Sequence, residues 1–309
     1  METRRQFLLQ AGAAAGAAGL VPAAGRAQEP AAAGSSFRLL YAPHFGMFRN
    51  HAGDDPIAQL EFAHAEGFRA WEDNGMAGRP VAEQERIARA MERLDMRMGV
   101  FVANFQTAFG KKSFSSGDPG LRDTFLGELR SAVEVAKRVN ATWMTVVLGD
   151  LDPRLPLEYQ HGHALDTLRR GAEILEPHGL VMVLEPLNPW RDHPGMYLQR
   201  SPQAWMLCRA VGSPAVKILF DIYHQQITEG NLIPNIDRCW EEIGYFQIGD
   251  NPGRQEPFTG EIHYPNVFRH IHGKGYTGIL GMEHGVSMPG RDGERLLIER
   301  YRRADAFPA

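Results

Sequence analysis

Four oxygen-bearing side chains each end a short apolar run in the second half of the chain. Glu185 follows the run at 180–184, Asp221 the run at 218–220, Gln247 the run at 244–246 and Glu283 the run at 278–282. Each run predicts a short buried strand. In a parallel barrel the carboxyl ends of the strands converge on one mouth. Three carboxylates and one amide oxygen suit a hard divalent cation, so we predict an Mg²⁺ or Mn²⁺ site there.

The two glutamates of this set, Glu185 and Glu283, are the candidate catalytic residues. A glutamate that binds a cation through one oxygen can still move a proton with the other. Two of them on opposite sides of a bound substrate could act as base and acid in turn. The predicted chemistry is proton transfer on a small substrate held beside the metal.

Other polar residues in the loops after these strands are candidates for substrate binding. His224 lies three residues after Asp221, and Arg254 follows Gln247 in a turn where its guanidinium could hold carboxylate or hydroxyl oxygens. Glu261 lies on the same long loop as Arg254. Ordinary surface, loop or capping roles remain open for each of them.

Three more candidates come from other strand ends that face the same mouth. His193 belongs to the loop after the Glu185 strand, whereas Glu72 and His44 lie at the ends of the second and first predicted strands. A strand-end residue such as Glu72 or His44, taken alone, is more often structural. We include them as predicted substrate-binding residues because parallel strands would bring their ends together.

Apolar runs alternate with longer helical patterns from residue 37 onward. The predicted strands cover about 38–42, 68–71, 97–103, 143–148, 180–185, 217–221, 244–247 and 278–283. A polar loop of about 16 residues after the third strand is long enough to be a functional lid. Eight strand–helix pairs favour a single (β/α)₈ TIM barrel over a doubly wound open sheet. No helix opens with a G-x-G-x-x-G or P-loop sequence, so no nucleotide cofactor is expected.

The first 27 residues resemble a twin-arginine export signal. Arg4 and Arg5 precede an apolar stretch rich in Ala and Gly, and small residues end it near Ala27. We therefore predict a signal peptide over 1–27, a flexible lead-in over 28–36 and a catalytic barrel over 37–309. The mature protein would be periplasmic or otherwise extracytoplasmic, and the twin-arginine export machinery would be a transient partner. An uncleaved membrane anchor stays open.

Charge and cysteine content limit the kinds of partner and cofactor that are expected. The formal net charge is −4, so nucleic acid is not an expected partner. The two cysteines, Cys208 and Cys239, indicate neither a disulfide framework nor a Cys-based zinc site. A small molecule is the expected partner, and a homo-oligomer is left open.

With these residues in place, the chain resembles the hydroxypyruvate isomerase family of the xylose-isomerase-like barrel superfamily. The resemblance spans roughly 38–290 and is strongest from 180 onward. It rests on segments 184–189, 194–198, 220–225, 246–249, 252–257, 260–264 and 281–283. It implies a divalent metal held by Glu185, Asp221, Gln247 and Glu283, an acid/base pair in Glu185 and Glu283, and substrate contacts from His224 and Arg254.

The resemblance also implies a reaction. In aldose–ketose isomerisation one glutamate removes a proton next to a carbonyl, the metal stabilises the enediolate, and the other glutamate returns the proton to the neighbouring carbon. The leading hypothesis is an isomerase of hydroxypyruvate, tartronate semialdehyde or a similar small hydroxy-carbonyl compound. Two alternatives remain: an exported sugar epimerase or 3-keto-glycoside lyase with the same metal site, and a non-catalytic periplasmic sugar-binding barrel.

Overall fold

The computed structural model describes residues 37–307, so the predicted export signal and the lead-in lie outside the described residues. Within that range the chain forms eight short strands, all paired in parallel. They are β1 (Leu40–Ala42), β2 (Ala70–Trp71), β3 (Arg97–Met98), β4 (Trp143–Val146), β5 (Val181–Leu184), β6 (Val216–Asp221), β7 (Ile243–Gln247) and β8 (Ile279–Gly281).

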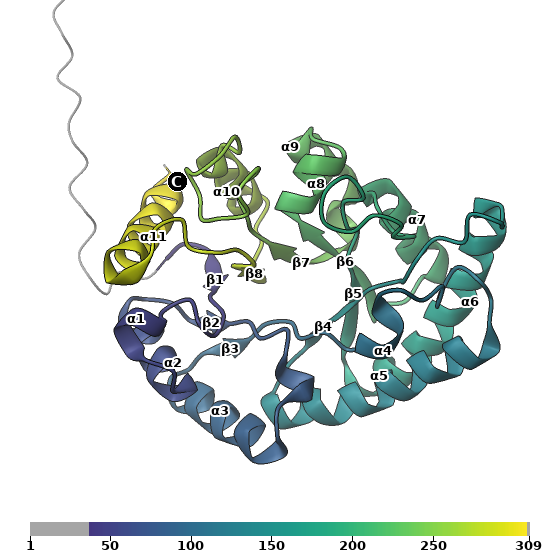
Figure 1. The fold of residues 1–309 in the computed structure, drawn as a ribbon, viewed down its shortest axis with the longest axis horizontal. Coiled ribbons are helices and arrows are strands. Elements are labelled where there is room, and N and C mark those ends of the chain that lie inside the picture. The colour runs from purple at the N-terminus through teal and green to yellow at the C-terminus, as the bar shows by residue number, and fades with distance from the viewer. Residues whose placement is uncertain (1–36, 308–309) are drawn as a thin grey trace, which may run out of the picture. The chain divides into compact units, whose positions relative to one another are not determined.

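The strands close into a barrel. Six of them form a continuous sheet in the order β1-β8-β7-β6-β5-β4, and β2 pairs with β3. Isolated bridges join the two sheets: His44 pairs with Glu72 on one side, and Met98 and Val102 pair with Ala141 and Thr145 on the other. Figure 1 looks down the resulting ring, with the strands inside and the helices outside. The predicted (β/α)₈ barrel is confirmed.

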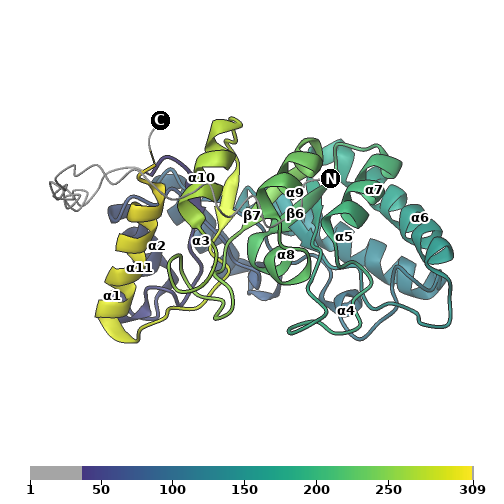
Figure 2. The same ribbon diagram turned by 90° about the horizontal axis from the view of Figure 1, so that it is seen from above.

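Eight helices of the described chain serve as the crossover layer. They are α2 (Pro56–Ala65), α3 (Val81–Arg93), α5 (Pro119–Val139), α6 (Leu157–Leu175), α7 (Ser201–Val211), α9 (Leu232–Cys239), α10 (Tyr264–Gly273) and α11 (Gly290–Asp305). In Figures 1 and 2, α11 lies beside the short helix α1 (Arg49–Ala52). There the buried Glu294 accepts hydrogen bonds from Asn50 and His51, which ties the last helix to the first.

Three short α-helices were not predicted from the sequence, and the first of them is α1. The polar stretch expected to be an irregular loop contains α4 (Phe105–Ala108), and α8 (Ile222–Thr228) begins directly after β6. The third strand is shorter than predicted, because it ends at Met98 rather than near residue 103. Val102 still reaches β4 through its bridge to Thr145. None of the helices in residues 37–307 combines the length and apolarity that a membrane span requires.

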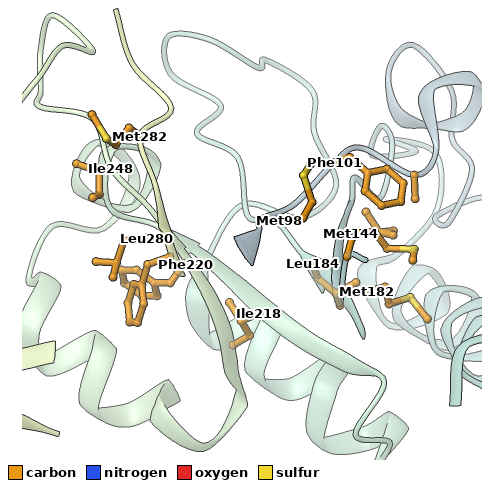
Figure 3. Close-up of a cluster of buried hydrophobic side chains, with 14 of the residues drawn as sticks. Met98, Phe101, Met144, Met182, Leu184, Ile218, Phe220, Ile248, Leu280 and Met282 are labelled. Atoms are coloured by element: carbon orange, nitrogen blue, oxygen red, sulfur yellow. The ribbon is translucent and has the colours of Figure 1, made fainter. Parts of the chain in front are cut away.

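Side chains along each strand alternate between two cores. Met182 and Leu184 of β5, Ile218 and Phe220 of β6, and Leu280 of β8 point outward and pack under the helices (Figure 3). The interior of the barrel holds a smaller set: Ala42, Ala70, Val100, Val183, Leu219, Tyr245 and Ile279. Since the period is two residues, the next inward positions are at 44, 72, 185, 221 and 247, the positions of the predicted site.

Candidate active site

The alternation along the strands brings three predicted carboxylates together at the carboxyl end of the barrel. Glu185 follows β5 directly, Asp221 ends β6, and Glu283 lies two residues beyond β8. One ligand atom from each of Glu185, Asp221, Glu283 and His224 lies within 4.8 Å of the others. Gln247 neighbours Asp221 in the β6–β7 register. The barrel mouth therefore gathers the predicted metal-site residues.

The two carboxylate oxygens of Asp221 have different roles, one in capping a helix and one in the candidate site. Its Oδ1 accepts hydrogen bonds from the backbone amides of Tyr223 and His224, at 2.7 and 3.1 Å, and so caps the N-terminus of α8. Its Oδ2 is buried and has no hydrogen-bond partner among the described residues. The helix cap fixes the carboxylate so that the free oxygen is left for a ligand.

His224 is held in one tautomer by Asn188. The Asn188 Oδ1 accepts from the backbone amides of Arg191 and Asp192, so its Nδ2 faces His224 Nδ1 at 2.6 Å. Nδ1 is then the acceptor, which leaves the ring proton on Nε2. Nε2 lies 3.7 Å from Asp221 Oδ2 and 3.9 Å from Glu185 Oε1. His224 thus presents an N–H donor to the site, which suits a substrate oxygen better than a metal ion.

Arg254 and Asn74 both contact Glu283. The Arg254 Nη2 lies 2.6 Å from Glu283 Oε2 and 3.7 Å from Asp221 Oδ2, while Asn74 Nδ2 donates to Glu283 Oε1 at 2.8 Å. The Arg254 guanidinium also stacks over the Tyr223 ring at 5.0 Å. These contacts fix the orientation of Glu283 and place a cation at the edge of the carboxylate cluster.

Glu72 lies fully inside the barrel and contacts the fourth predicted ligand. Its Oε1 accepts from Gln247 Nε2 and its Oε2 from the Tyr245 hydroxyl, each at 2.9 Å. Burial, with repulsion from Glu283, raises the pKa of Glu72 to about 8. The structure therefore places Glu72 against a predicted metal ligand, whereas the sequence suggested a substrate contact.

The electrostatics of the cluster oppose the accumulation of negative charge. Burial, followed by repulsion from Glu283 and Asp221, raises the pKa of Glu185 well above its ordinary value. Burial also raises the pKa of Asp221 and of Glu283, although Arg254 opposes the rise in both. Burial and Arg254 lower the pKa of His224 to about 3, so its ring is neutral. A divalent cation among these carboxylates would remove the repulsion and favour their ionised forms.

The donor set fits a hard divalent metal ion. Asp221 Oδ2 and Gln247 Oε1 are buried oxygens without hydrogen-bond partners in the described chain, next to two further glutamates. Unpaired buried oxygens are costly unless something binds them. Carboxylate and amide oxygens are the ligands that Mg²⁺ and Mn²⁺ prefer. Glu185, Asp221, Gln247 and Glu283 would hold the ion.

The remaining predicted residues lie in different surroundings. The His193 ring packs on His224, with centroids 5.3 Å apart, so it lines the site. Both ring nitrogens of His44 face backbone carbonyls, those of Phe45 and His284, which is a structural role. Glu261 is exposed, and its carboxylate accepts from Asn251 and Gln226 rather than from the cluster.

Several residues around the site escaped the sequence analysis. They are Asn74, Asn188, Asp192, Tyr223 and Tyr245. Asn188 lies three residues after Glu185, in a segment that carried the family resemblance, but nothing in its spacing showed that it would face His224. Asn74 is four residues beyond the inward-facing Ala70, and the strand period alone would have placed it at the mouth.

Known proteins resemble this chain over most of its length. A family model described as the xylose isomerase-like TIM barrel matches residues 60–303. The chain is 31% identical over 244 residues to the 2-oxo-tetronate isomerase of Cupriavidus necator, covering 77% of this chain and 89% of that protein. It is 33% identical over 166 residues to the hydroxypyruvate isomerase of Escherichia coli, covering 54% of this chain and 64% of that protein.

Solved structures agree on the fold. The 3-keto-D-glucoside 4-epimerase of E. coli superimposes with a TM-score of 0.69 at 18% identity, over 86% of this chain and 99% of that one. The curated relatives are named as isomerases, in agreement with the enzyme class expected from the sequence. The barrel, the matched residues and these relatives together show that the chain belongs to the xylose isomerase-like TIM barrel family.

Proposed function

We propose that this protein is a divalent-metal-dependent aldose–ketose isomerase of hydroxypyruvate isomerase type. The observation that carries the proposal is the convergence at the barrel mouth of one ligand atom each from Glu185, Asp221, Glu283 and His224, all within 4.8 Å of one another. Glu185 and Glu283 lie in the same cluster, and a carboxylate there can take up a proton and release it again. The isomerase names of the curated relatives support the same reaction class.

The residues of the chain divide the work of a 1,2-proton shift. One of Glu185 and Glu283 takes the proton from the carbon that bears the hydroxyl, and the other delivers a proton to the former carbonyl carbon. The hydroxyl proton passes to the former carbonyl oxygen. The His224 Nε2–H donates to a substrate oxygen as negative charge develops on it. Asn74 and Arg254 keep the Glu283 carboxylate oriented. A divalent cation held by the four oxygen ligands would supply Lewis acidity to the same oxygens.

Arg254 supports a substrate that carries a carboxylate. Its side chain is only 28% exposed and its guanidinium stacks on Tyr223, so it is ordered beside the cluster rather than free in solvent. A planar guanidinium with several N–H donors suits a carboxylate, and 2-oxo acids bring one next to their carbonyl. We infer hydroxypyruvate, tartronate semialdehyde or a similar short hydroxy-carbonyl acid as the substrate class.

The test is proton exchange between solvent and substrate. Purified protein loaded with Mn²⁺ would be incubated with hydroxypyruvate in D₂O, beside Glu185→Gln and Glu283→Gln. We expect deuterium in the carbon-bound position and isomerised product with wild type, and neither with the two variants. Wild type that retains one Mn²⁺ but exchanges no carbon-bound proton of any hydroxy-carbonyl acid would refute the proposal.

A second candidate, an epimerase or lyase of larger sugars, is favoured by the aromatic residues near the site. Phe109 is 47% exposed and stacks on His193, which in turn packs on His224. Trp190, in the same loop as His193, is 73% exposed. Exposed aromatic faces near a site suit the apolar side of a sugar ring. Exchange into ketoses or 3-keto-glycosides, but not into hydroxypyruvate, would select this candidate.

Export is proposed from the sequence alone. Arg4 and Arg5, the apolar stretch and the small residues near Ala27 have the order of a twin-arginine signal. Fusing residues 1–27 to a reporter that is active only outside the cytoplasm tests this. We expect export that is lost when both arginines are changed to lysine, and export that persists in that variant would argue against the twin-arginine route.

A further inference from the structure

Glu72 lies beneath the candidate metal site, in the barrel interior. Glu72 is only 2% exposed, and each of its carboxylate oxygens accepts one hydrogen bond. Gln247 Nε2 donates to Oε1 and the Tyr245 hydroxyl donates to Oε2, both at 2.9 Å. The Glu72 carboxylate thus connects two neighbouring inward positions of β7, the lower of which, Tyr245, belongs to the interior core.

Two glycines make room for this arrangement. A Cβ on Gly281, the inward position of β8 beside Gln247, would lie 1.8 Å from Glu72 Oε2. A Cβ on Gly99 would lie 2.4 Å from the Tyr245 hydroxyl. A side chain at position 281 would displace Glu72, and a side chain at position 99 would displace Tyr245. The barrel backbone is therefore shaped around the Tyr245–Glu72–Gln247 contacts.

The contact with Glu72 determines which end of the Gln247 amide faces the site. A glutamine side chain can present either its oxygen or its NH₂ group, and only the oxygen can bind a cation. In the structure both Glu72 oxygens are acceptors, Oε1 from Gln247 Nε2 and Oε2 from the Tyr245 hydroxyl, so the NH₂ end of Gln247 faces Glu72. Gln247 Oε1 is then directed away from Glu72, and it is the oxygen that has no hydrogen-bond partner in the described chain.

We propose that Glu72 is a positioning residue that orients the Gln247 amide so that its oxygen serves as the fourth metal ligand. This inference rests on the proposed metal-dependent function and extends it to a residue outside the ligand set. Groups that orient metal ligands typically change metal affinity by about 10- to 100-fold when they are removed. The Tyr245 hydroxyl donates a hydrogen bond to the other carboxylate oxygen of Glu72.

The experiment compares Mn²⁺ affinity, measured by calorimetric titration, in wild type and four variants. Glu72→Met removes the acceptor for Gln247, whereas Tyr245→Phe removes one hydrogen bond from Glu72 but keeps the contact with Gln247. Gln247→Glu places a second carboxylate against Glu72. The double variant Glu72→Gln/Gln247→Glu exchanges the donor and the acceptor, so the contact and an outward-facing oxygen are both kept. Circular dichroism melts report the folding of each variant.

We expect Glu72→Met to bind Mn²⁺ about 10- to 100-fold more weakly, and Tyr245→Phe to stay within about threefold of wild type. We expect Gln247→Glu to bind Mn²⁺ more weakly than wild type. The double variant should bind Mn²⁺ at least about tenfold more tightly than Gln247→Glu. If Glu72→Met does not fold, the comparison of Gln247→Glu with the double variant decides.

Three results would overturn the proposal while leaving the metal-dependent function intact. They are a folded Glu72→Met that binds Mn²⁺ like wild type, equal losses in Glu72→Met and Tyr245→Phe, and a double variant no better than Gln247→Glu. Wild type that binds no Mn²⁺, Mg²⁺ or other divalent cation would overturn both this proposal and the proposed function.

Discussion

The guanidinium of Arg254 lies 2.6 Å from the carboxylate of Glu283 at the edge of the candidate site. The two residues come from different loops, after β7 and after β8, and Arg254 adopts a positive φ of 51°. Left-handed backbone is uncommon for a non-glycine residue and is found at functional sites. An arginine side chain remains charged at every working pH. The contact therefore places a permanent positive charge beside Glu283, one of the two proposed proton carriers.

Arg254→Met should reduce turnover of carboxylate substrates selectively. Loss of a charge-assisted hydrogen bond costs about 1.5–3 kcal/mol, which corresponds to roughly a 10- to 100-fold fall in kcat/KM. Steady-state kinetics with hydroxypyruvate and with an uncharged ketose measure this, and Arg154→Met, whose side chain is 83% exposed, is the control. Equal losses for both substrates would show that Arg254 acts on Glu283 rather than on a substrate carboxylate.

Divalent metal should stabilise the fold, because it relieves repulsion among three buried or half-buried carboxylates. Mn²⁺ at 100 times its Kd would add about 2.7 kcal/mol, or roughly 5–10 °C in Tm for a barrel of this size. Thermal melts with Mn²⁺ and with EDTA measure the shift. Asp221→Asn should lose most of it, whereas Asp166→Asn on the surface of α6 should keep it. An equal shift in both variants would place the stabilising ion elsewhere.

Asn188→Asp should reverse the tautomer of His224. An ionised aspartate cannot donate to Nδ1, so the ring proton would move to Nδ1 and Nε2 would become an acceptor. The lost donor should lower kcat by roughly tenfold or more. Nitrogen chemical shifts of the histidine ring report the tautomer directly. A variant with the wild-type tautomer and reduced activity would show that Asn188 acts in another way.

Glu256 gives a prediction on stability and pH. Burial opposes its ionisation, but hydrogen bonds from Ser287 and Arg300 hold the pKa of this carboxyl below its usual range. An acid whose pKa is lower in the folded state stabilises that state above the unfolded pKa, and this contribution is lost as the pH falls through the folded pKa.

Glu256→Gln should therefore lower the free energy of unfolding by about 3 kcal/mol near pH 7, since Arg300 loses a buried partner. Urea unfolding between pH 7 and pH 3 measures the difference from wild type, which should shrink below about pH 4. Glu61→Gln, at an exposed ion pair, is the control and should be near neutral at every pH. A difference that stays constant down to pH 3 would refute the role of ionised Glu256.

Residue types and strand period predicted the barrel and the convergence of Glu185, Asp221 and Glu283, because both depend on local patterns. The orientation of these groups depends on contacts between distant parts of the chain. Asn74 meets Glu283 across 209 positions and Glu72 meets Gln247 across 175. No local pattern encodes such a pair. The short helices α1, α4 and α8 were also missed, since none of them is long enough to show a helical period.

Part of the barrel is closed by a continuous sheet and part by isolated bridges between strands. The second part can therefore change more easily than the first. The strands before all four proposed ligands belong to the continuous six-stranded sheet, whereas β2 and β3 join it through isolated bridges. Changes in the length or sequence of the segment after β3 can alter the entrance to the candidate site without moving the strands that carry the ligands. In such a design, the segment after β3 can change which substrates fit while the proposed ligands keep their positions.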